Sequence, residues 1–85
     1  MEAYLLIETD RETGPIAGFL RGVPGVLLAQ DVRGPYDALA LARSDPGGRG
    51  LERALAEIRG MPGVIRALAA PLIPAPAEVA EGRAA

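Results

Sequence analysis

The sequence LRGVPGV at residues 20–26 returns as IRGMPGV at residues 58–64. Each copy follows apolar residues at helical spacing and precedes a run of residues that favours a strand. The two copies therefore predict two helix–turn–strand units, in which a Pro-Gly pair turns the chain from helix to strand. We expect Gly22 and Gly60 to end the helices in the left-handed conformation, which glycine adopts without steric penalty.

Strand and helix patterns extend these units over residues 1–73. Apolar runs predict four strands, at residues 3–8, 26–32, 38–42 and 64–70. Pro15 opens a short first helix, whose apolar face consists of Ile16, Phe19, Leu20 and Val23. A longer amphipathic helix carries its apolar face at Leu51, Ala54, Leu55, Ile58 and Met61.

The resulting order, βαββαβ, is the ferredoxin-like α+β plan. Its right-handed crossovers place two helices on one face of a four-stranded antiparallel sheet. The second and third strands form a hairpin, because their connection is too short for a crossover. We expect the Pro-rich residues 74–85 to form a disordered C-terminal tail.

Two of the predicted strands are apolar on both alternating faces, although the helices cover one face only. Residues 38–42 place alanines on one face and leucines on the other, and the alanine face lets another backbone approach closely. An apolar sheet face needs a cover. The simplest cover is the same face of a second copy, which predicts a two-fold homodimer that pairs through its sheets.

Composition excludes several kinds of chemistry in this chain of 85 residues, which lacks Cys, His, Lys, Asn and Trp. Without Cys and His there is no ordinary zinc, haem or iron–sulfur site, and no Ser-His-Asp or Cys-His catalytic arrangement. The nine Arg are spread along the chain rather than concentrated, which disfavours direct nucleic-acid binding. We therefore expect no enzymatic activity, no metal and no cofactor.

The same sequence favours a cytoplasmic location. Its apolar runs are too short to span a membrane, and the start of the chain lacks the pattern of a signal peptide. The absence of cysteine suits a reducing compartment.

The sequence GPYD at residues 34–37 is the one dense cluster of special residues. Proline fixes φ, glycine allows positive φ and aspartate binds neighbouring amides, so the cluster predicts a turn. A functional reading adds to the turn. At an oligomer seam its free amides would bind a carboxylate, Tyr36 would provide an aromatic wall and Asp37 would bind an ammonium group. A second polar loop, at residues 44–50, is interpreted as a helix start capped by Asp45.

Four motifs together resemble a known family. YLLIET at residues 4–9, VPGV at 23–26, GPYD at 34–37 and IRGMPGV at 58–64 occur in the order and spacing of the ligand-binding domain of the Lrp/AsnC feast/famine regulators. The resemblance covers residues 2–73 and assigns residues 1–73 to an effector-binding domain.

This resemblance implies a dimeric α+β barrel that assembles further into a ring of dimers. It also implies a small effector, often an amino acid, bound between dimers at Gly34, Tyr36 and Asp37, with Arg33 and Pro35 beside them. Full-length members begin with a helix-turn-helix domain, whereas this chain begins on its first strand. We therefore expect a stand-alone form that modulates transcription by co-assembly with helix-turn-helix-bearing relatives, without binding DNA itself.

Two alternatives remain beside this sensor hypothesis. A ligand-free assembly subunit is favoured by the last strand, because residues 66–70 are mostly alanine where family members often carry hydroxyl groups. A small dimeric α+β barrel enzyme is disfavoured, because such sites generally rely on the His, Asn or Trp that this chain lacks.

Overall fold

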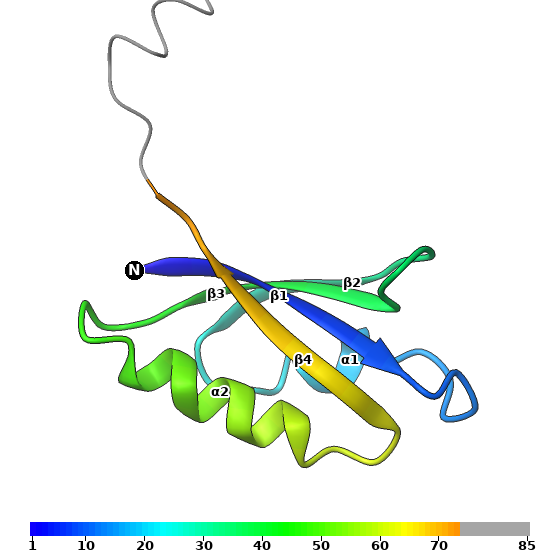
Figure 1. The fold of residues 1–85 in the computed structure, drawn as a ribbon. Coiled ribbons are helices and arrows are strands. Elements are labelled where there is room, and N and C mark those ends of the chain that lie inside the picture. Colours follow the sequence, from blue (N-terminus) through cyan, green and yellow to red (C-terminus); the bar gives the residue numbers. More distant parts are fainter. Residues whose placement is uncertain (74–85) are drawn as a thin grey trace, which may run out of the picture.

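Six elements follow one another in the predicted order βαββαβ in the computed structural model, which describes residues 1–73 (Figure 1). They are β1 (Glu2–Thr9), α1 (Ala17–Leu20), β2 (Val26–Asp31), β3 (Ala38–Arg43), α2 (Arg49–Arg59) and β4 (Val64–Pro71). The tail expected at residues 74–85 lies outside the described residues. No helix within residues 1–73 is long and apolar enough to cross a membrane.

The strands form one antiparallel sheet in the order β2-β3-β1-β4, so β2 and β4 are its two edges. Both helices lie on the same side of the sheet (Figure 1). This arrangement confirms the predicted ferredoxin-like α+β fold, including the hairpin between β2 and β3.

The repeated sequence makes the same turn in both halves of the fold. Gly25 and Gly63 have φ of 94° and 86°, and the amide of the following valine closes each turn by donating to the residue before the proline. Positive φ at the third residue is the signature of a type II turn. The predicted left-handed conformation of Gly22 and Gly60 is therefore wrong, since Gly60 has φ of −84° and Gly22 has no positive φ.

The physical reason lies in how the helices end. The amide of Val23 donates to the Leu20 carbonyl at 3.0 Å, and Met61 makes the matching bond to Ile58 at 3.0 Å. Each helix thus ends in one additional hydrogen bond between residues three apart, which tightens its last turn. The chain then reverses direction at the Pro-Gly pair that follows. At Gly25 a Cβ atom would lie 3.0 Å from the Arg43 carbonyl oxygen, so this turn also requires close backbone approach.

The core lies between the sheet and the helices. Its largest fully buried side chains are Leu5, Ile7, Leu20 and Ile58. The alanine face of β3 turns toward the helices, and Ala38, Ala40 and Ala42 are each at most 2% exposed. The expected close approach to this face is thus made by the chain's own helices.

Helix α1 is shorter than its apolar pattern indicates. It has one turn, and Phe19, which was expected in the buried face, is 68% exposed. The amides of Ile16 and Ala17 donate to the Asp31 carboxylate at the end of β2, at 2.9 and 3.0 Å. These two hydrogen bonds fix the start of α1. A helix of a single turn cannot direct all four apolar residues toward the sheet.

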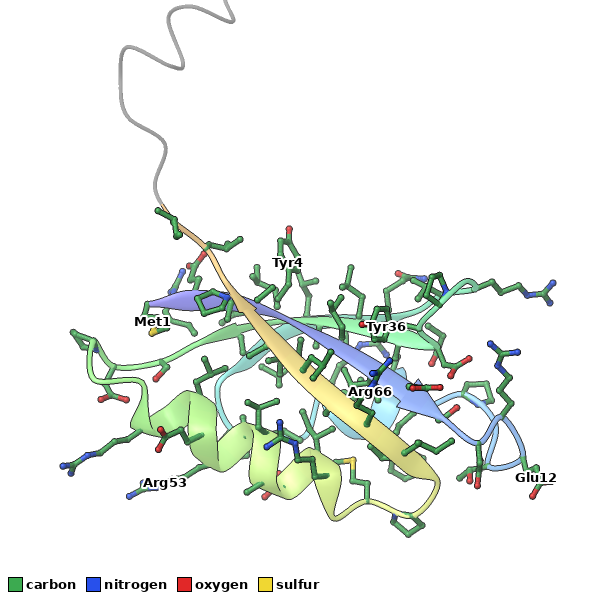
Figure 2. The ribbon with its side chains drawn as sticks, viewed as in Figure 1. Met1, Tyr4, Glu12, Tyr36, Arg53 and Arg66 are labelled. Carbon is green, nitrogen blue, oxygen red and sulfur yellow. The ribbon has the colours of Figure 1, made fainter. Side chains whose placement is uncertain are left out.

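The opposite face of the sheet is also apolar, and no helix within residues 1–73 covers it. Figure 2 shows Tyr4 projecting from this side, away from the helices. Tyr4, Leu28 and Leu68 are 39%, 50% and 37% exposed. The half-buried Leu6, Leu39 and Leu41 lie among them. We call these six residues the open sheet face.

Candidate functional site

The GPYD turn between β2 and β3 is anchored to the end of β1 through Asp37. The Asp37 amide donates to the Ile7 carbonyl at 2.8 Å. Its carboxylate accepts the Thr9 amide at 2.8 Å and pairs with the Arg11 guanidinium at 3.0 Å. The Thr9 amide first, and then Arg11, hold the pKa of Asp37 below its ordinary value. Asp37 is therefore ionised at neutral pH, with both oxygens engaged.

Arg11 belongs to this site, although sequence reasoning did not select it. Within residues 1–73 it is the one non-glycine residue with positive φ, at 65°. Its amide donates to the Thr9 hydroxyl at 3.1 Å, while its guanidinium reaches Asp37 and also the Gly34 carbonyl at 3.4 Å. A left-handed arginine is a locally unfavourable conformation, of about 1–2 kcal/mol, that the surrounding bonds must hold in place.

A hollow of about 630 Å³ opens between this turn and the loop that leads into α1. It is lined by Thr9, Arg11, Gly14, Pro15, Ile16, Asp31, Val32, Arg33, Gly34 and Asp37. Three of the five predicted site residues, Arg33, Gly34 and Asp37, therefore line one cavity. Pro35 and Tyr36 are not among its lining residues.

Tyr36 lies with residues of β1 and β4 instead. The Arg66 guanidinium lies 5.8 Å from the centre of its ring, within the range of a cation–π contact. Arg66 also pairs with Glu8 at 3.3 Å, and Figure 2 shows Arg66 and Tyr36 next to each other. The predicted aromatic wall and the predicted carboxylate thus separate, with Asp37 in the hollow and Tyr36 stacked beside Arg66.

The hollow combines charges of both signs. Arg11 and Arg33 bring two guanidinium groups, and Asp31 and Asp37 bring two carboxylates. The carboxylates are engaged internally, because Asp31 accepts two amides of α1 and Asp37 is bound by Thr9 and Arg11. Arg33 is exposed and is therefore the charge most open to an incoming ligand. The Arg11 guanidinium already binds Asp37 and the Gly34 carbonyl, but its side chain is 71% exposed and can donate to a ligand as well. Such a site is suited to binding a carboxylate.

The loop before α2 serves the helix. Asp45 accepts the Gly50 amide at 3.0 Å, and the Ser44 hydroxyl accepts the Leu51 amide at 3.1 Å. The Gly50 amide, followed by the Ser44 hydroxyl, lowers the pKa of Asp45. The N-cap residue of α2 is Gly48, in the left-handed conformation and without a side-chain cap bond, so the interpretation of Asp45 as the capping residue is wrong in position. Asp45 lies three residues earlier and instead accepts an amide of the first turn.

Similar folds occur among solved structures. FFRP-DM1, whose name denotes a feast/famine regulatory protein, is 27% identical, with 85% of this chain and 97% of that chain covered at a TM-score of 0.69. TTHA0845 from Thermus thermophilus is 27% identical, covering 87% and 94% of the two chains at a TM-score of 0.71. The hypothetical protein PHS023 from Pyrococcus horikoshii is 27% identical, covering 85% and 90% at 0.63. No family model and no curated protein matches the chain.

The likeness to FFRP-DM1 extends over nearly the whole of that chain. The chain therefore has the fold of an Lrp/AsnC-like domain.

Proposed function

We propose that the chain is an effector-binding domain of the Lrp/AsnC type. In this proposal it has no enzymatic activity, associates through the open sheet face and binds a small carboxylate-bearing effector, an amino acid in the first instance. Binding would alter its assembly with helix-turn-helix-bearing relatives and thereby modulate transcription.

The observation that carries this proposal is the hollow beside the GPYD turn, on a fold shared with a feast/famine regulatory protein. The exposed guanidinium groups of Arg11 and Arg33 provide donors for an effector carboxylate. The turn that follows Arg33 is hydrogen-bonded to β1 through Asp37. A shift of this turn would be transmitted to the middle of the sheet.

The open sheet face supports the proposed association. Tyr4, Leu28 and Leu68 expose apolar surface on the side of the sheet opposite the helices. Ion pairs lie on two borders of this surface, Arg43 with Glu2 at 2.7 Å and Arg66 with Glu8 at 3.3 Å. An apolar centre with a polar rim is the usual composition of a protein interface.

One observation favours the alternative of a ligand-free assembly subunit. Both oxygens of Asp37 already bind protein groups, so an effector ammonium would have to share this carboxylate with the Thr9 amide and Arg11. In that alternative the turn is a structural connection and the hollow remains filled with solvent.

A thermal-shift screen over the amino acids at millimolar concentration tests the proposal. A ligand at 100 times its Kd stabilises the folded state by about 2.7 kcal/mol, which raises Tm by about 10 °C or more in a domain of this size. Arg33→Gln should abolish the response, because it removes a charge from the hollow. Arg49→Gln is the matched control on α2 and should keep the response.

Failure of every amino acid to raise Tm would refute the amino-acid version. Sedimentation of Asp37→Ala then distinguishes a sensor of another effector from a ligand-free assembly subunit. A sensor keeps its oligomer when Asp37 is removed, whereas an assembly subunit whose turn is structural loses it.

A further inference from the structure

The repeated sequence contains an arginine that the turn itself does not need. Pro and Gly make each turn, yet both copies also retain arginine at the same place, Arg21 and Arg59. Arg21 donates from Nη2 to the Ala29 carbonyl at 2.9 Å. Arg59 donates from Nε and Nη2 to the Ala67 carbonyl at 3.2 and 2.8 Å. The two arginines therefore make equivalent contacts in the two halves of the fold.

Both acceptor carbonyls lie on an edge of the sheet. Ala29 is in β2 and Ala67 is in β4, which are the two edge strands. In an antiparallel strand the N–H and C=O of one residue point to the same side, and successive residues alternate. The Val32 amide bonds to Asp37 on the β3 side, so Ala29, three residues earlier, points outward.

The same reasoning applies to β4. The Leu72 amide bonds to the Glu2 carbonyl and the register is continuous from Ala67 to Pro71, so Ala67 also points away from β1. Pro71, four residues after Ala67, also points away from β1 and lacks an N–H group. The outward side of β4 is thus occupied by Arg59 in its middle and ends on a residue without a donor.

An open edge strand can recruit another strand, and natural proteins commonly block it with charge or proline. Both edges here need such protection, because β2 (VLLAQD) and β4 (VIRALAAP) are short on charge and rich in apolar residues. A strand that docked on either edge would have to displace a guanidinium from its carbonyl acceptor or bury that charge.

We propose that Arg21 and Arg59 block strand addition at both edges of the sheet and so leave the open sheet face as the surface through which copies associate. The excluded partner is a β-strand of a second copy of this chain. The inference goes beyond the proposed function, because it needs no effector and holds for a ligand-free subunit as well.

The test uses the variant pair Arg21→Met and Arg59→Met, which keeps an apolar stem and removes the donors. A Leu41→Glu background suppresses association through the open sheet face, so that edge pairing is observed alone. Mass is measured by sedimentation and light scattering between about 10 µM and 1 mM, the range in which exposed edges aggregate. Infrared amide I spectra report intermolecular strand pairing.

The double variant should grow with concentration to well beyond twice the mass of the Leu41→Glu background, because each molecule then has two open edges. Either single variant should stop at twice the background mass, since one open edge per molecule closes by pairing with its copy. Arg49→Met with Arg53→Met removes the same charge from α2 and should stay at the mass of the background.

Circular dichroism establishes that each variant is folded. If the double variant fails to fold, the two single variants still test the proposal, because the proposal predicts a discrete dimer for each of them. The proposal is overturned if every folded arginine variant keeps the mass of the Leu41→Glu background, or if the α2 control grows as much as the double variant.

Discussion

The two faces of the sheet are both apolar, yet at the central strand β3 they differ in the size of the side chains that they present. Toward the helices β3 contributes Ala38, Ala40 and Ala42, each at most 2% exposed. Toward the open face the same strand contributes Leu39 and Leu41, which remain partly exposed. The strand therefore buries its small residues in the domain core and places its large ones outside.

This distribution is unfavourable for an isolated domain, since burial of apolar surface stabilises by about 25 cal/mol per Å² and leucine offers more surface than alanine. It becomes favourable when a second surface covers the leucines. The alanines in turn let α1 and α2 approach the sheet closely. The helix face is therefore suited to tight internal packing and the open face to association.

The largest expected effect comes from the helix face. Leu5→Ala removes a fully buried side chain and should lower the free energy of unfolding by about 2–5 kcal/mol. Urea denaturation measures this change. Leu6→Ala, on the same strand and the opposite face, should cost clearly less in dilute protein. Equal losses for the two variants would show that the faces do not differ as described.

Enlarging the helix face should be the next most harmful change. Ala40→Leu forces a larger side chain into a position with 0% exposure and should cost about 1–3 kcal/mol through displaced helices. Thermal unfolding measures it. Leu39→Ala, one residue away and on the open face, serves as the control. Adding it to Ala40→Leu should not restore stability, because the two residues lie on opposite faces of the sheet.

Leu41→Glu tests the open face directly. A charge at the centre of this surface should weaken self-association by at least about 100-fold, because it would be buried without a partner. Sedimentation over a range of concentrations measures the change. Phe19→Glu introduces the same charge at an exposed apolar residue of α1 and should leave the mass unchanged. A wild-type protein that is monomeric at about 1 mM would contradict the interpretation of this face.

The smallest effect concerns Asp37, which connects the turn to β1. Its folded pKa lies below the ordinary value of 3.8, so the unfolded chain takes up a proton first as the pH falls. The stability that Asp37 contributes is therefore fully present above about pH 5 and is lost as the pH falls through the folded pKa. Asp37→Asn should lower Tm by about 2–5 °C at pH 7 and by less at low pH.

Thermal melts between neutral and acidic pH measure this difference. Glu12→Gln in the neighbouring loop is the control and should follow the wild-type curve at every pH. A constant gap between Asp37→Asn and wild type down to acidic pH would argue against the role of the ionised carboxylate.

Much of the fold was predictable because its signals are local. The apolar pattern of α2 and the two Pro-Gly turns depend on neighbours along the chain, and the structure confirms both. The extent of α1 was not predictable from its pattern. Its start is set by Asp31, a residue of β2 that the sequence places 15 positions after Ile16.

The candidate site was predictable in part for the same reason. The turn at residues 34–37 is a local signal, whereas its contact with Arg11 requires the end of β1 to lie beside it. The one sequence signal for this contact is the polar loop after β1, which carries an arginine that could pair with the aspartate of the turn. The separation of Tyr36 from the hollow depends on Arg66 in β4 and has no local signature.

The sequence alone determined the order of elements, the turn conformations that glycine and proline impose and the presence of two apolar sheet faces. These properties follow from the conformational preferences of each residue and from the two-residue period of a strand. Only the tertiary structure decided which face of β3 the helices cover, which groups surround the hollow and which carbonyls Arg21 and Arg59 bind. Those choices depend on which distant segments pack together, because side chains compete for the same space and the same hydrogen-bond partners once the chain is folded.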